Sequence, residues 1–153
     1  VHMTSYAPLL AKEGHTQWNP DLIYFNNREV KPTTGYYVQK LYGQNAGNEY
    51  LPSKITLDNR DDQVRKRIAA SIVRDSASGD VIVKLVNLLP VEVNTNVDLS
   101  GIGVIQPSAK RTVLTGKPAD TPLPVEDTVE VAEKFDCQLS AYSFTVIRIK
   151  KGK

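Results

Sequence analysis

Residues 67–88 read RIAASIV-RDSASGD-VIVKLVNL, and this stretch decides the fold. Two apolar runs rich in β-branched residues, Arg67–Val73 and Val81–Leu88, flank a polar segment that contains Gly79. β-Branched residues favour strands, and a short glycine-containing segment between two such runs is typical of a β-hairpin. The sequence therefore predicts two neighbouring antiparallel strands here.

More strand candidates follow at short intervals, separated by turn signals rich in proline and glycine. They are Glu92–Leu99, Ala109–Thr115, Thr128–Ala132 and Tyr142–Lys150. Apolar and polar residues alternate in the last of these until Val146 and Ile147 break the pattern, which indicates either a β-bulge or burial on both faces. Several short strands with no helical periodicity predict an antiparallel β-sandwich over residues 48–153.

The first third of the chain, residues 1–47, has a different pattern. Val1–Leu10 is mostly apolar and predicts a buried parallel strand, followed by a loop. Thr33 is a candidate helix N-cap, because its hydroxyl can accept a hydrogen bond from a free backbone N–H. In the predicted helix, Tyr37, Val38, Leu41 and Tyr42 form one apolar face, and Gly43 and Gly47 are candidate ends.

Composition excludes several classes of protein. The chain has 153 residues, of which 41% are hydrophobic and 24% charged, with a net charge of +2, as expected for one globular domain or a domain with a partial second element. The short basic runs carry no interleaved aromatic residues, so we expect no nucleic-acid partner. A single cysteine and two histidines predict no disulfide, no metal site and no cofactor. No apolar run is long enough to span a membrane, so we expect no membrane partner.

Three segments near the start carry a family resemblance: SYAPLL at residues 5–10, QWNPDLIYFNN at 17–27 and GYYVQKLY at 35–42. They resemble the last strand, last loop and last helix of the catalytic barrel in the α-L-arabinofuranosidases of glycoside hydrolase family fifty-one. The resemblance implies a mainly β fold, in which a C-terminal antiparallel β-sandwich of jelly-roll type at residues 48–153 follows a strand-loop-helix remnant of a (β/α)8 barrel at residues 1–47. One departure is Thr34-Gly35, where family members commonly carry Thr-Pro before the helix.

The resemblance also implies a function. Family members are exo-acting, retaining hydrolases that release terminal arabinofuranose from arabinan- or arabinoxylan-type side chains with two glutamates about 5 Å apart. Those glutamates lie on earlier barrel strands, so the resemblance places both before Val1. We expect this chain to contain no catalytic residue, to be structural, and to be inactive alone.

The resemblance further implies the partners and the compartment. The implied partners are the upstream catalytic barrel of the same protein, an arabinose-containing polysaccharide or oligosaccharide, and a second copy of the chain in a homo-oligomer. We expect a secreted or periplasmic protein, with a cytoplasmic location as the alternative.

The loop after Leu10 holds the candidate substrate-binding residues. Trp18 presents an apolar plane that can stack on a sugar ring, or can instead pack under the barrel rim or against the sandwich. His15, Gln17 and Asn19 can hydrogen-bond to sugar hydroxyls, or can instead satisfy backbone groups of the loop. Tyr6, near the end of the predicted strand, either lines the cleft or packs in the barrel wall.

The alternative function is a non-catalytic carbohydrate-binding β-sandwich. Such modules usually present two or three exposed rings, and the predicted sandwich offers only Tyr50, Phe135, Tyr142 and Phe144, of which Phe144 is expected to face the core.

Asp58–Asp62 has the composition of a calcium loop but not its spacing, so a solvated turn is expected there. Cys137 has no partner that suggests a nucleophile and is expected to be a half-buried strand thiol.

Overall fold

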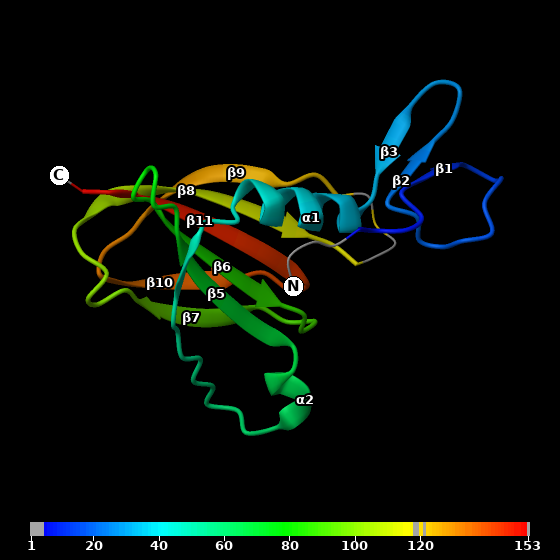
Figure 1. Cartoon of the computed structure of the whole chain (residues 1–153). Helices are drawn as coiled ribbons and strands as arrows, with labels where there is room; N and C mark the ends of the chain where they lie inside the picture. Colours follow the sequence, from blue (N-terminus) through cyan, green and yellow to red (C-terminus); the bar gives the residue numbers. More distant parts are fainter. Residues whose placement is uncertain (1–4, 118–119, 121, 153) are drawn as a thin grey trace.

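The computed structural model of this chain describes residues 5–117, 120 and 122–152. Figure 1 shows their arrangement, with a β-rich body and an N-terminal extension. The helices are α1 Thr34–Gln44 and α2 Asp62–Arg65. The strands are β1 Leu10–Lys12, β2 Ile23–Phe25, β3 Val30–Pro32, β4 Glu49–Leu51, β5 Ile68–Arg74, β6 Val81–Asn87, β7 Val93–Asp98, β8 Ile105–Thr115, β9 Val125–Glu130, β10 Lys134–Leu139 and β11 Ser143–Lys151.

Two antiparallel sheets form the body. The larger has six strands in the order β4-β5-β6-β11-β8-β9, and the smaller pairs β10 with β7. Apolar side chains from both sheets meet between them, among them Val83, Ile147, Leu99 and Leu139. The mainly β fold with an antiparallel C-terminal sandwich is therefore confirmed.

The hairpin of residues 67–88 forms β5 and β6, as predicted. Its turn is held by Arg148 of β11, whose guanidinium donates 2.7 Å hydrogen bonds to the carboxylates of both Asp75 and Asp80. Gly79 adopts φ +76°, a left-handed conformation that glycine accommodates readily. The glycine-containing turn that the sequence predicted between the two strands is therefore the turn that forms.

Strand β11 lies in the middle of the larger sheet, between β6 and β8. Ser143–Ile147 are all buried. Burial on both faces is thus the reason that alternation breaks at Val146, and the register shift lies later, between Ile149 and Lys151.

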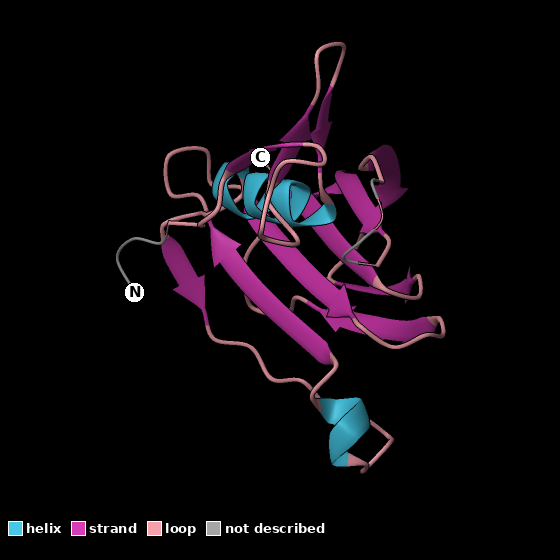
Figure 2. Cartoon of the chain, turned by 90° about the vertical axis from the view of Figure 1, so that its right-hand side faces the viewer, coloured by secondary structure: helices cyan, strands magenta, loops and turns pink. Residues whose placement is uncertain are grey.

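Helix α1 covers the outer face of the six-stranded sheet, as Figure 2 shows. Thr33 caps the helix by accepting a hydrogen bond from Tyr36 N, as predicted. Leu41 packs in a second apolar cluster with sheet residues that include Ile82 and Phe144. The helix runs through Gly43 to a C-cap at Asn45, so the expected end at Gly43 is wrong, while Gly47 has the positive φ that favours glycine. The domain boundary between residues 47 and 48 stays a prediction.

A second small sheet, β1-β2-β3, forms what we call the N-terminal leaf, residues 5–33, which projects away from the sandwich in Figure 1. β1 pairs in parallel with β2, and β2 pairs antiparallel with β3. The buried parallel strand expected within Val1–Leu10 is displaced: a parallel strand forms at Leu10–Lys12 with Leu10 exposed, and Ser5–Leu9 are not in a strand. Pro8 within that segment has no N–H to donate to a sheet. Residues 1–4 lie outside the described residues.

Three further expectations need correction. β9 occupies Val125–Glu130 instead of Thr128–Ala132. Cys137, expected to be a half-buried strand thiol, does lie on a strand, β10, whose bounds were not predicted, but it is buried there. Asp58–Asp62 is exposed as expected, but Asp61 also caps the short helix α2 by accepting a hydrogen bond from Gln63 N.

Candidate functional site

The candidate residues lie in or beside one loop of the leaf, residues 13–22, which connects the parallel strands β1 and β2. The loop starts where Glu13 N donates to Phe25 O (2.9 Å) and ends where Leu22 N donates to Pro8 O (3.3 Å). His15, Gln17, Trp18 and Asn19 are all exposed on this loop. Tyr6 joins them by donating a 3.3 Å hydrogen bond to Pro20 O.

Trp18 is the most exposed large side chain of the loop, with 65% of its surface accessible. Its backbone is fixed by Thr16, whose hydroxyl accepts from Trp18 N (3.1 Å) and donates to Trp18 O (3.3 Å). Packing against the sandwich, one of the two alternatives for this residue, does not occur within the described part of the chain. The ring is therefore positioned by a local turn and presented to solvent.

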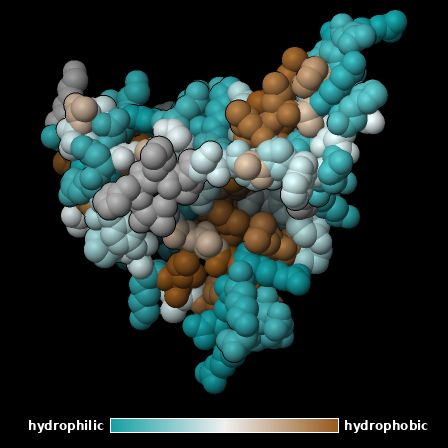
Figure 3. All heavy atoms as spheres, turned by 45° about the vertical axis from the view of Figure 1, so that its right-hand side comes forward, coloured by the Kyte–Doolittle hydropathy of each residue, from teal (hydrophilic) through white to brown (hydrophobic). Residues whose placement is uncertain are grey.

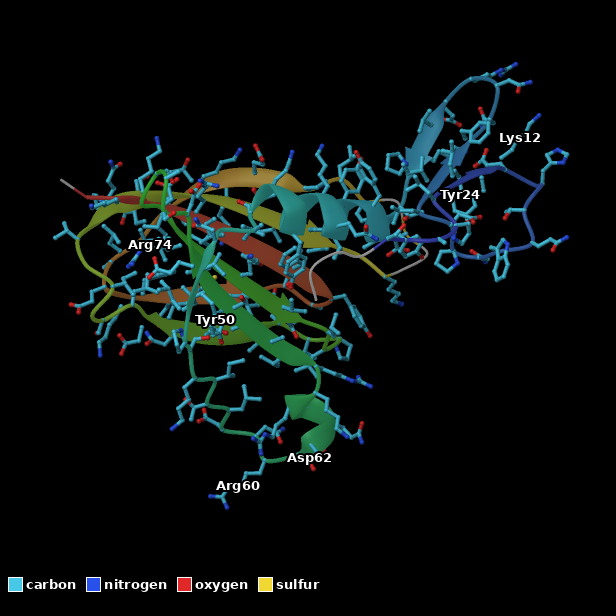
Figure 4. All side chains as sticks on the ribbon, in the orientation of Figure 1. Lys12, Tyr24, Tyr50, Arg60, Asp62 and Arg74 are labelled. Carbon is cyan, nitrogen blue, oxygen red and sulfur yellow. The ribbon has the colours of Figure 1, made fainter. Side chains whose placement is uncertain are left out.

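Tyr24 of β2, which is labelled in Figure 4, hydrogen-bonds to the later residues of the loop. Its hydroxyl accepts a 2.8 Å hydrogen bond from Asp21 N and donates a 3.2 Å hydrogen bond to Asn19 Oδ1. Asn19 is exposed, and its amide Nδ2 donates no hydrogen bond to a described residue. The sequence did not single out Tyr24, although it lies inside the PDLIYF block.

Asp21 was also missed by the sequence analysis, and it is the most unusual group of the leaf. It is 0% exposed, and neither carboxylate oxygen has a hydrogen-bond partner among the described residues. A buried polar group without a hydrogen-bond partner is costly. No sequence signal revealed the burial of Asp21.

The outer end of the leaf, beside the turn between β2 and β3, carries a charged cluster that links the end of β1 to β3. Lys31 of β3 lies 2.8 Å from Glu13 and 3.0 Å from Glu29. Hydrogen bonds to Lys31 hold the pKa of both carboxyls below their usual range and raise the pKa of the ammonium. The cluster fixes the position of β3 relative to the start of the loop.

Two surface hollows lie elsewhere, at the sandwich. The first hollow has a volume of about 770 Å³ and is lined by Pro107, Phe135 and residues 128–132, among others. The second has a volume of about 420 Å³ and is lined by Arg74, Glu49 and residues 102–105, among others. Each is lined by a single carboxylate, Glu130 in the first and Glu49 in the second. Neither hollow therefore offers the pair of carboxylates that retaining glycoside hydrolysis requires.

Within the described ranges, no three His, Cys, Asp or Glu side chains are grouped so that they could hold a metal ion. The helices described are all too short or too polar to cross a membrane.

Comparison with known proteins supports the family resemblance. A family model described as the α-L-arabinofuranosidase C-terminal domain matches residues 1–147. The extracellular exo-α-L-arabinofuranosidase of Streptomyces chartreusis is 52% identical over 56 residues, which cover 37% of this chain and 7% of that protein. α-L-Arabinofuranosidase 1 of Arabidopsis thaliana is 31% identical over 165 residues, which cover 99% of this chain and 24% of that protein.

Solved structures give the same result. An arabinose-bound GH51 α-L-arabinofuranosidase is 28% identical, with a TM-score of 0.83, and the match covers 97% of this chain and 24% of that one. CelM2, a bifunctional glucanase-xylanase, has a TM-score of 0.63 at 20% identity, and this likeness shows a shared fold alone. The chain spans about a quarter of the length of the Arabidopsis relative and of the arabinose-bound enzyme. From the family match over residues 1–147, this chain belongs to the α-L-arabinofuranosidase C-terminal domain family.

Proposed function

We propose that this chain is the C-terminal part of an exo-acting, retaining α-L-arabinofuranosidase that releases terminal arabinofuranose from arabinan- or arabinoxylan-type side chains. The family match over residues 1–147 carries this proposal, and the names of the relatives support it. A relative named as extracellular supports export of the parent protein. The parent would consist of a catalytic barrel together with the sandwich described above.

The proposed role of the 153 residues themselves is structural and substrate-contacting, without catalysis. Retaining hydrolysis needs one carboxylate as nucleophile and a second as acid and base, about 5 Å apart. Two pairs of carboxylates each share a cation, Glu13 and Glu29 with Lys31 and Asp75 and Asp80 with Arg148, and each hollow has only one carboxylate. We therefore expect no hydrolysis by these residues alone.

The loop of residues 13–22 is the proposed substrate contact. In a (β/α)8 barrel, the loops that follow the strands lie at the C-terminal face, where the active site is built. As a segment that would follow the last barrel strand, the loop would lie at that face in the parent. Trp18 offers an exposed ring for a sugar face, and Asn19, Gln17 and His15 offer polar groups beside it.

Substitution of Trp18 in the parent protein tests this contact. Trp18→Ala removes the ring, and loss of a stacking interaction should lower kcat/KM on an arabino-oligosaccharide about tenfold. Trp18→Phe, which keeps an aromatic face, should restore much of it. Val30→Ala is the matched control, because Val30 is equally exposed on β3 of the same leaf.

Two outcomes distinguish the alternatives for Trp18. A fall in kcat/KM with an unchanged unfolding midpoint supports the sugar contact. A lower unfolding midpoint of the parent with unchanged kcat/KM would instead mean that the ring packs against the barrel, and the proposed contact would be withdrawn.

A further inference from the structure

A second charged feature lies at the opposite end of the molecule from the leaf. The chain between β4 and β5, residues 52–67, leaves the sandwich as an excursion that carries α2, and we call it the basic arm. In Figure 1 it hangs below the sheets, and in Figure 3 it forms the hydrophilic lobe at the bottom of the molecule. Every residue of the arm is exposed except Leu57 and Val64, which are half-buried.

The arm concentrates the net charge of the protein. It holds five cations, Lys54, Arg60, Arg65, Lys66 and Arg67, and three carboxylates, Asp58, Asp61 and Asp62. Its net charge of +2 equals that of the whole chain, so the other residues carry as many acidic as basic groups. The positive potential of this chain therefore arises at the arm.

The cations of the arm form no ion pairs among the described residues. The ion pairs among the described residues use Lys31, Arg74, Lys110, Arg111, Lys134 and Arg148, and none uses an arm cation. Asp61 is committed to the backbone, since it accepts from Gln63 N at the start of α2. Figure 4 shows Arg60 pointing away from the sandwich, at the outer end of the arm.

The spacing of these charges indicates the kind of ligand. The cations extend along a strip of chain from Lys54 to Arg67, and no arm residue lines either of the two hollows. A small anion would need a pocket with converging donors, whereas an extended polyanion can meet successive cations along the strip and gains from several weak contacts at once. The arm contains no aromatic residue, so the stacking that favours single-stranded nucleic acids is missing there.

We propose that the basic arm binds polysaccharide that carries carboxylate groups, such as a chain of uronic acid units, and so holds the parent protein on acidic regions of its substrate. This inference rests on the proposed function, because it takes the parent to act on polysaccharide. It adds a second contact, electrostatic and remote from the leaf. The contact should weaken with salt, since the screening length falls from about 10 Å at 0.1 M to about 3 Å at 1 M ionic strength.

Binding of the parent protein to polygalacturonate, measured by titration calorimetry at low salt, tests the proposal. The arm variant is Arg65→Gln, Lys66→Gln and Arg67→Gln together. The control is Lys12→Gln, Lys40→Gln and Lys150→Gln, three exposed cations outside the arm that change the net charge equally. The arm variant should bind about tenfold more weakly or worse, because each cation near an anionic surface contributes separately. The control should bind like the unmodified protein.

Three results would overturn the proposal. These are equal binding to fully methyl-esterified polygalacturonate, equal loss in the control variant, or tighter binding to duplex DNA than to polygalacturonate. Hydrolysis of a neutral chromogenic arabinofuranoside separates this inference from the proposed function. If that activity is absent from the parent, the proposed function fails. Suppose instead that the parent hydrolyses this substrate and that the arm variant hydrolyses it equally well. If the arm variant also binds polygalacturonate as tightly as the unmodified protein, only the arm proposal fails.

Discussion

Leu41 tests whether α1 is an integral part of the sandwich. Its side chain is 6% exposed and packs in one cluster with Val73, Ile82, Phe144 and other residues of the outer sheet face. Replacing a buried leucine with alanine removes this apolar burial and leaves a cavity, which costs about 2–5 kcal/mol. Because alanine is the best helix former, none of this loss can come from helix propensity.

Urea denaturation followed by far-UV circular dichroism measures the effect of Leu41→Ala. With a slope of roughly 2 kcal/mol per molar urea, the midpoint should fall by about 1–2.5 M. Lys40→Ala is the matched control, since Lys40 is exposed on the same helix, and it should shift the free energy of unfolding by less than about 0.5 kcal/mol. Equal small effects of the two substitutions would refute the reasoning and show that α1 does not stabilise the sheet.

Two further predictions concern carboxylates. A hydrogen bond from Lys134, together with hydrogen bonds from Ser100, holds the pKa of Asp98 below its usual range. The contribution of Asp98 to stability is therefore fully present above the unfolded-state pKa near 4, and it is lost as the pH falls through the lower folded-state pKa. Asp98→Asn should therefore flatten the decline of the urea midpoint below about pH 4, and an unchanged pH profile would count against the ion pair. Asp21→Asn replaces a buried carboxyl group that has no hydrogen-bond partner among the described residues with a neutral side chain of the same shape, so it should not lower the midpoint. A fall would mean that the carboxylate has a partner after all.

The strands of the body could be predicted where the pattern was strong. β6 and β11 have apolar runs that are buried on both faces, β5 has a mostly half-buried apolar run, and a turn with a left-handed glycine separates β5 from β6. β10 was missed although Phe135, Cys137 and Leu139 alternate inward, because it has only six residues and charged residues at its start. Such a strand depends on its pairing with β7 more than on its own composition.

The leaf was harder to predict. β2 and β3 have only three residues each. They are held in place by strand pairing, β2 with both β1 and β3, so the local sequence carries little signal for them. The loop that gathers the candidate residues could be found, because Trp18 and its polar neighbours are close in sequence. The burial of Asp21 and the bridging hydroxyl of Tyr24 could not, because both follow from the tertiary path of the loop.

The central claim is that these residues belong to an arabinofuranosidase without supplying its catalytic carboxylates. The most direct test compares hydrolysis of 4-nitrophenyl α-L-arabinofuranoside by the purified 153-residue chain and by the parent protein, at equal molar concentration. The account predicts turnover by the parent and none by the chain alone. Turnover by the chain alone would contradict it and require a pair of catalytic carboxylates within these residues.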